Sequence, residues 1–131
     1  MFSTTFPSVI QAAAGEFLND YVFIVIGRLL GGACVDVIQE FIQVERNEKR
    51  NRLLEILEDL SSDDKVLVFC ESSKGADFLA TILSVKKINT TSIHSDRTQD
   101  QREEALREFT NGRRQVLVTT FIAARGLGKI F

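Results

Sequence analysis

The chain has 131 residues, of which 44% are hydrophobic and 26% charged, and its formal net charge is −2. These values favour one soluble globular domain, or one domain with a short extension, and exclude a chain that binds nucleic acid through a strongly basic overall charge. Cys34 and Cys70 fit a reducing compartment, and with one histidine they lack the spacing of a zinc site. Residues 21–35 are apolar but short, and Arg28 interrupts them, so we expect no membrane span.

The N-terminal part alternates between apolar runs and breaks. A short β-like run over residues 1–6 precedes Pro7, which suits the first turn of a helix, and apolar residues then recur at helical spacing through Leu18. Residues 21–26 are apolar and rich in β-branched side chains, which predicts a buried strand. Glycines over residues 27–32 end this pattern and indicate a linker.

Two further elements are predicted after the linker. Residues 35–44 predict another strand, and residues 46–60 predict an amphipathic helix whose charged side chains face solvent. The side chains expected on the buried face of that helix are Leu53, Leu54, Ile56, Leu57 and Leu60.

Three apolar, β-rich runs then begin near Lys65, Thr90 and Gln115, and segments with helical spacing separate them. Each interval is long enough for a strand, a crossover helix and two turns. The order strand–helix–strand–helix–strand predicts an α/β fold, with a parallel sheet and helices packed on it.

Polar residues gather just beyond the predicted carboxyl end of each strand. They occupy residues 71–74, residues 94–97, and Thr119 with Thr120. In open α/β sheets this edge is where ligands bind. Hydroxyl donors at the edge, together with Arg102 in the first turns of a helix, suit phosphate oxygens. Such contacts hold a nucleic-acid backbone without reading its bases.

An equally good interpretation of these hydroxyl groups is structural. Ser72, Thr98 and Thr120 can each cap a helix or a turn without contacting any ligand. His94 could be either a polar residue that ends a strand or a catalytic histidine. We favour the first interpretation.

Signatures of catalysis are absent from the sequence. It contains no G-x-x-x-x-G-K-[ST] loop to cradle the phosphates of a nucleotide, and no Ser-His-Asp or Cys-His arrangement with a supporting spacing. We therefore assign no catalytic residue and no metal ligand.

Several segments, spread over nearly the whole chain, carry motifs in a characteristic order. They are residues 1–7 (MFSTTFP), 31–37 (GGACVDV), 68–72 (VFCES), 74–80 (KGADFLA) and 93–97 (IHSDR), then Gln99 with Arg102 in the spacing Q-x-x-R, and residues 116–128. In this order they resemble the Ser-Ala-Thr motif, the interdomain linker, motif IV and its continuation, the Ile-His-Gly-Asp-Arg segment, the Q-x-x-R motif and motif V of the DEAD-box ATP-dependent RNA helicases. Within that family the chain is most similar to the Vasa-like group.

The resemblance implies a RecA-like parallel sheet with flanking helices, which is the fold of the helicase C-terminal domain, in truncated form. It divides the chain into a remnant of the first RecA-like domain at residues 1–26, an interdomain linker at residues 27–36 and an incomplete C-terminal helicase domain at residues 37–131.

One strand of the family's sheet would be missing. The strand that follows the Arg-Gly stretch is expected between the strands matching Val66–Cys70 and residues 116–119, and the chain ends before it. We therefore expect two strands that lack partners, in a chain that is marginally stable and prone to pair through its open sheet edges. The alternatives are direct pairing between the two strands, or a stub begun by Ile130 and Phe131 that covers part of the gap.

The resemblance also implies roles for individual residues. Ser72, Arg102 and Thr120 occupy positions that hold the RNA sugar-phosphate backbone, and Ser95 stands where a glycine backbone approaches the RNA. Ser3 and Thr5 lie in the motif that links ATP hydrolysis to strand separation.

Two positions depart from the family pattern. At Gly128 the family has an aspartate that contacts the nucleotide ribose, and glycine offers no carboxylate. Phe121 stands where a small or acidic residue is usual.

The parent activity implied is RNA binding and unwinding driven by ATP hydrolysis, with ATP and Mg²⁺ as cofactors. The chain lacks the phosphate-binding loop, the Asp-Glu-Ala-Asp motif and motif VI, so we expect it to bind no cofactor and to be inactive alone. RNA is the expected partner, protein partners on the C-terminal domain are a further expectation, and the expected compartment is the cytoplasm, with germ granules or the nucleus as alternatives. The alternative function is a non-catalytic α/β protein-interaction module or a non-functional truncated product.

Overall fold

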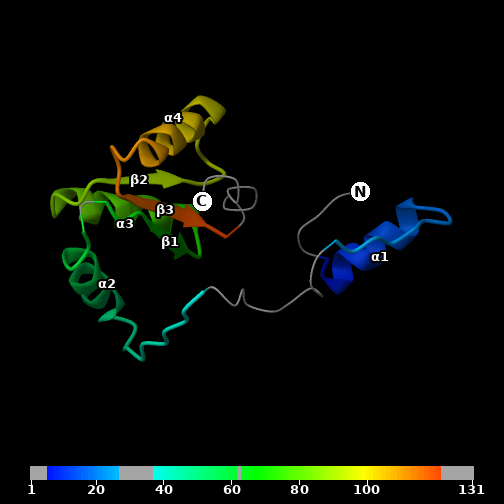
Figure 1. The fold of residues 1–131 in the computed structure, drawn as a ribbon, viewed down its shortest axis with the longest axis horizontal. Helices are drawn as coiled ribbons and strands as arrows, with labels where there is room; N and C mark the ends of the chain where they lie inside the picture. The colour runs from blue at the N-terminus through cyan, green and yellow to red at the C-terminus, as the bar shows by residue number, and fades with distance from the viewer. Residues whose placement is uncertain (1–5, 27–36, 62, 122–131) are drawn as a thin grey trace. The chain divides into compact units, whose positions relative to one another are not determined.

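The computed structural model of the chain describes residues 6–26, 37–61 and 63–121. These belong to two compact units, of which the first reaches Ile42 and the second begins at Gln43. No helix in the described ranges is long and apolar enough to cross a membrane. The described elements in chain order (Figure 1) are α1 (Ser8–Phe17), α2 (Lys49–Glu58), β1 (Val66–Cys70), α3 (Ser73–Val85), β2 (Thr90–Ile93), α4 (Gln99–Thr110) and β3 (Val116–Thr120).

The first unit contains the helix that Pro7 was expected to open. Pro7 is the N-cap of α1, and its φ of −65° suits a chain entering a helix, but it provides no side-chain cap. Of this helix only Ala14 is buried, whereas Val9 and Phe17 on the predicted apolar face remain exposed.

Two predicted strands are absent from the described residues. Residues 21–26 form no strand, and their side chains are between 42% and 95% exposed. The described part of the second predicted strand, residues 37–44, is irregular as well, with Ile38 and Phe41 almost fully exposed. Both predictions were wrong because an apolar run becomes a strand only where another strand accepts its backbone hydrogen bonds. In the described part of this unit no such neighbour exists.

Helix α2 lies within the predicted helix of residues 46–60 but is shorter, and one of its predicted core positions is exposed. Leu57 is buried, and Leu53, Leu54 and Leu60 pack against the same core. Ile56 was expected inside but is 40% exposed. It lies one residue before Leu57, about 100° away around the helix, so it falls beside the apolar stripe instead of on it.

The second unit holds a parallel sheet of three strands, as the sequence predicted, and the strand order is β1-β3-β2. The three arrows of Figure 1 point the same way. Strand β3 is central and pairs with β1 from Val66 opposite Val116 to Cys70 opposite Thr120. The gap implied between these two strands is therefore not present, and the expected alternative of direct pairing holds.

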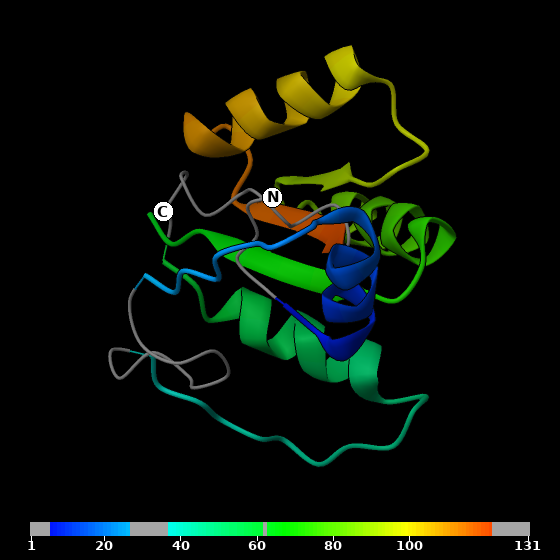
Figure 2. The same ribbon diagram turned by 90° about the vertical axis from the view of Figure 1, so that its right-hand side faces the viewer.

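Helices cover both faces of the sheet. Figure 2 shows α4 on one face and α2 on the other. Alternate side chains of β3 point to opposite faces of the sheet and pack into two separate hydrophobic cores. Val116 and Val118 pack with residues of α2 and α3. Leu117 packs with Ala105 and Phe109 of α4. All of β3 is buried. These features are those of the predicted RecA-like fold.

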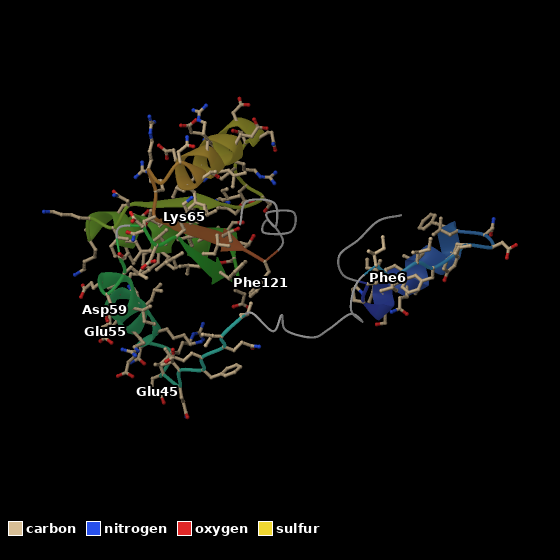
Figure 3. All side chains as sticks on the ribbon, viewed as in Figure 1. Phe6, Glu45, Glu55, Asp59, Lys65 and Phe121 are labelled. Carbon is tan, nitrogen blue, oxygen red and sulfur yellow. The ribbon has the colours of Figure 1, made fainter. Side chains whose placement is uncertain are left out.

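Because the strands are parallel, their carboxyl ends lie at one edge of the sheet. In Figure 3, Lys65 precedes β1 and Phe121 follows β3, so the two labels mark the opposite edges. The segments after β1 and β2 lead directly into α3 and α4. Both helices therefore begin at the carboxyl edge.

Candidate nucleic-acid interface

The sheet register sets which strand ends are neighbours. Cys70 at the end of β1 lies opposite Thr120, and Ile93 at the end of β2 lies opposite Thr119. The segments that carry Ser72 and Ser95 therefore leave the sheet on either side of the end of β3. This arrangement follows from the strand order, which the sequence alone did not specify.

Ser72 is the N-cap of α3. Its Oγ accepts a hydrogen bond from the backbone N–H of Gly75 at 3.1 Å. A Cβ at position 75 would lie 3.1 Å from the same oxygen, so a larger residue there would crowd the cap. The capping interpretation of Ser72 is correct, yet it does not exclude a ligand contact, because an accepting hydroxyl keeps its own hydrogen for donation.

Ser95 lies in the turn between β2 and α4 and is exposed. Its hydroxyl donates to Asp96 Oδ1 at 3.1 Å, and its oxygen lies 3.5 Å from the hydroxyl oxygen of Ser73. The loop after β1 and the turn after β2 therefore approach each other at this edge.

Thr120 ends β3 and is only 8% exposed. Its carbonyl oxygen accepts a hydrogen bond from Thr119 Oγ1 at 3.3 Å. Ser72 and Thr98 both cap helices, Thr98 in a capping box with Gln101 at the start of α4. Residues 122–131, which follow Phe121, lie outside the described residues, so the capping interpretation of Thr120 stays a prediction. Of the four residues predicted to contact RNA, Thr120 has the smallest exposed fraction.

Arg102 lies in the second turn of α4. Its backbone N–H donates to the carbonyl of Thr98, and one terminal nitrogen lies 3.4 Å from Gln99 Oε1. Its Nε is buried and has no hydrogen-bond partner within the part of the chain that the structure describes. In the same part, Arg97, Arg107 and Arg114 each pair with a carboxylate, whereas Arg102 does not. Its positive charge is therefore available to an anion.

The structure brings the loops of Ser72 and Ser95 together through Ser73. In the described ranges no hydrogen bond links Arg102 or Thr120 to either loop. Ser3, Thr5 and Gly128 lie outside the described residues.

Phe121, which departs from the family pattern, lies just beyond Thr120 and is 69% exposed. Its ring stacks on that of Phe69, with centroids 5.0 Å apart and an angle of 15° between the planes. The aromatic ring at this position therefore covers a neighbouring phenylalanine of β1.

Sequence reasoning missed a cluster of polar side chains behind this edge. Asp77 Oδ1 accepts hydrogen bonds from Arg97 Nη2 at 2.7 Å and Ser92 Oγ at 2.8 Å, and it lies 2.9 Å from His94 Nε2. His94 directly follows β2 and is only 2% exposed. A signal for the cluster was present, since Asp77 is the only acidic residue of α3.

The surroundings of Asp77 change its acidity. Partial burial alone would raise the pKa of this carboxyl, but hydrogen bonds from His94, Arg97 and Ser92 and the charge of Arg97 outweigh burial and lower the pKa from 3.8 to about 2. Asp77 is therefore a carboxylate at neutral pH.

Cys70 is a free cysteine, and burial raises the pKa of its thiol. It is therefore a thiol at neutral pH, which is a weak nucleophile. Within the described residues no group of three His, Cys, Asp or Glu side chains could hold a metal ion.

Comparison with known proteins identifies the family. The helicase conserved C-terminal domain matches residues 48–128, which is more than half of the chain. The chain belongs to this family. It is 54% identical over 127 residues to the ATP-dependent RNA helicase vasa of Drosophila melanogaster, and 52% identical over 128 residues to the probable ATP-dependent RNA helicase DDX4 of Bos taurus. These alignments cover 97% of this chain but only 19% and 17% of the relatives. The chain is thus Vasa-like and spans about a fifth of the length of these DEAD-box RNA helicases.

Solved structures agree with this assignment. A DEAD-box protein from Methanococcus jannaschii aligns with 95% of the chain at 29% identity and a TM-score of 0.65, and the aligned part is 32% of that protein. The E. coli DEAD-box protein SrmB, crystallised with the regulator of ribonuclease activity A, aligns with 60% of the chain and 46% of its own length, at 33% identity and a TM-score of 0.53.

Proposed function

We propose that the carboxyl edge of this sheet holds the sugar-phosphate backbone of RNA in a Vasa-like, ATP-dependent RNA helicase that unwinds RNA duplexes. The observation that carries the proposal is Arg102, a cation at the start of α4 that pairs with no carboxylate in the described part of the chain. Ser72, Ser95 and Thr120 would supply hydroxyl groups at the same edge of the sheet.

The chemistry of the edge suits a phosphate more than a base. A guanidinium can donate two parallel hydrogen bonds to phosphate oxygens, and a serine hydroxyl can add a third without specifying a sequence. Two helices also start here, and the unpaired N–H groups of a helix N-terminus favour an anion. Asp100 in the first turn of α4 opposes this attraction, so we expect weak binding.

The remaining assignments from the family stay within this proposal. Ser3 and Thr5 would link ATP hydrolysis to strand separation. The division into residues 1–26, 27–36 and 37–131 as domain remnant, linker and C-terminal helicase domain is part of the same proposal.

The residues of this chain do not fit ATP and Mg²⁺. The sequence has no phosphate loop, and Gly128 has no carboxylate for a nucleotide ribose. We therefore propose that these cofactors serve the parent helicase and that this chain contributes RNA contacts without hydrolysing ATP.

Protein partners on the same domain are part of the proposal, supported by the E. coli neighbour, whose structure contains a bound protein. The compartment proposed is the cytoplasm, with germ granules or the nucleus as the alternatives for a Vasa-like protein.

Arg102→Ala tests the RNA proposal. Fluorescence anisotropy with labelled oligouridine of about ten nucleotides would measure affinity between about 50 and 200 mM salt. Loss of one charge-assisted contact should weaken binding by about 1.5–3 kcal/mol. The slope of log affinity against log salt should also become shallower by about 0.7, because one fewer counterion site is released from single-stranded RNA.

Arg107→Ala is the matched control. It removes the same charge from the other end of α4, where Arg107 pairs with Glu104. This variant should retain most of the affinity. Equal losses in both variants would indicate binding through overall charge, and unchanged binding in Arg102→Ala would favour the protein-interaction alternative.

A further inference from the structure

A single carboxylate oxygen joins three segments of the second unit. Asp77 Oδ1, from α3, is within hydrogen-bond distance of Ser92 on β2, of His94 directly after β2, and of Arg97 in the turn before α4. The three distances lie between 2.7 and 2.9 Å.

The partners of Asp77 are themselves held in place. Ser92 and His94 are buried, at 4% and 2% exposure. Arg97 also donates to Ser92 Oγ at 2.9 Å, and its backbone N–H donates to the carbonyl of His94 at 3.2 Å. Because Ser92 and His94 are buried, breaking their contacts with Asp77 would leave desolvated polar groups, although the side chains of Asp77 and Arg97 are 46% and 36% exposed.

The network connects the two helices that carry the candidate interface, α3 with its cap Ser72 and α4 with Arg102. Asp77 is in the same helix that Ser72 caps, and Arg97 immediately precedes Thr98, the cap of the helix that carries Arg102. The pair Asp77–Arg97 therefore fixes the start of α4 relative to the start of α3. The hydroxyl oxygens of Ser73, at the start of α3, and Ser95, in the turn before α4, lie 3.5 Å apart.

Asp77 is unsuited to contact RNA itself, because its negative charge would repel a phosphate. Its bond to Arg97 also neutralises a cation close to the edge. Overall charge therefore predicts that removing Asp77 strengthens RNA binding, whereas a positioning role predicts the opposite.

We propose that Asp77 is a positioning residue for RNA binding, which acts through Arg97 to hold the start of α4, with Arg102, in a fixed position relative to the start of α3, with Ser72. This inference rests on the RNA-binding function proposed above. It differs from that function because it assigns a role to a residue that touches no RNA.

The test compares Asp77→Asn with Glu71→Gln in the purified full chain. Both variants remove one negative charge near the same edge, but Glu71 is exposed and lies outside the network. With labelled oligouridine as the probe, Glu71→Gln should bind slightly more tightly than the unaltered chain. Asp77→Asn should bind about tenfold more weakly, and its salt slope should be shallower by about 0.7, since the two sides no longer engage together.

A double-variant cycle separates positioning from loss of folding. Arg97→Gln should weaken binding as much as Asp77→Asn, and the double variant should lose little more, because both changes break one link. Ser92→Ala keeps all charges and should lower the RNA affinity about twofold. This variant replaces Asp77→Asn in the test if circular dichroism shows that Asp77→Asn does not fold. A purely structural role would lower only the folded fraction and leave the salt slope unchanged.

The outcomes distinguish the two proposals. If the unaltered chain binds no RNA, the proposed function and this inference both fail. If the chain binds RNA and Arg102→Ala weakens it, but Asp77→Asn binds as tightly as Glu71→Gln with the full salt slope, only the positioning role of Asp77 is overturned.

Discussion

Two runs of this chain with high strand propensity have opposite structures. Residues 21–26 (YVFIVI) are irregular, and Ile26 is 95% exposed. Residues 116–120 (VLVTT) form the central strand β3, in which every side chain is buried. Strand propensity favours the first run at least as strongly, because it contains more large apolar side chains.

The difference shows that neighbours decide whether such a run is a strand. Strand β3 exchanges backbone hydrogen bonds with β1 on one side and β2 on the other, and helices cover both of its faces. Residues 21–26 have no paired strand among the described residues of their unit. A run with high strand propensity therefore forms a strand only where neighbouring strands accept its backbone hydrogen bonds and other elements cover its apolar side chains.

The largest expected effect comes from removing the same side chain in each region. Phe109 of α4 is fully buried against β3, whereas Phe17 of α1 is 83% exposed. Phe109→Ala should destabilise the second unit by about 3–5 kcal/mol, because it removes apolar contacts and leaves a cavity. Urea unfolding followed by circular dichroism would measure this loss.

Phe17→Ala serves as the comparison and should change stability by less than about 0.5 kcal/mol. Phe78→Ala, at a 61% exposed position of α3, gives a control inside the second unit. Similar losses at Phe17 and Phe109 would show that the first unit has a core of its own, and the contrast between the regions would be wrong.

A smaller effect is expected at the helix starts. Helix α4 begins with a capping box between Thr98 and Gln101, while Pro7 gives α1 no side-chain cap. Thr98→Ala should cost about 1 kcal/mol because the cap bond to Gln101 N–H is lost. Thermal unfolding would measure the change.

Thr110→Ala, in the last turn of α4, makes the same substitution without touching the cap. It should be neutral or slightly stabilising, because alanine has the higher helix propensity. If Thr98→Ala behaves in the same way, the capping box contributes nothing to α4.

The smallest effect is a pH dependence that only the second unit should show. Hydrogen bonds and charge hold the pKa of Asp77 at about 2, below its ordinary value of 3.8. A carboxyl whose pKa is lowered on folding stabilises the fold above its unfolded pKa, and this contribution disappears as pH falls through the folded value. The stability difference between the unaltered chain and Asp77→Asn should therefore shrink between about pH 4 and pH 2.

That change should not exceed about 1 kcal/mol, since Asp77 is 46% exposed and solvent screens its interactions. Urea unfolding of both proteins at several pH values would measure it, because the titration of all other groups cancels in the difference. A difference that stays constant from pH 5 to pH 2 would contradict the lowered pKa.

Much of the second unit was predictable from local pattern. The intervals between the runs at Lys65, Thr90 and Gln115 predicted three parallel strands with helices between them, and the polar residues after each run predicted the carboxyl edge. The motif order from residues 68 to 128 predicted the helicase family. These patterns involve residues close together in the sequence, and the elements they predicted are present in the fold.

The candidate interface was only partly predictable. Ser72 and Arg102 could be named from their positions after a strand and near the start of a helix. The sequence left open whether Ser72 caps α3, and it could not show that Arg102 lacks a carboxylate partner. The contact of Asp77 with Arg97 joins residues from different elements, and no sequence period marks it.

By itself, the sequence determined the strands and helices of residues 66–120 and the family to which the chain belongs. The reason is that hydrophobic periodicity, capping residues and motif order are all properties of residues close together in the sequence. Only the tertiary structure decided that β1 and β3 pair directly, that residues 21–26 stay irregular and that one oxygen of Asp77 links three segments. Each of these depends on which distant backbone or side chain is within hydrogen-bond distance, and that proximity exists only once the chain has folded.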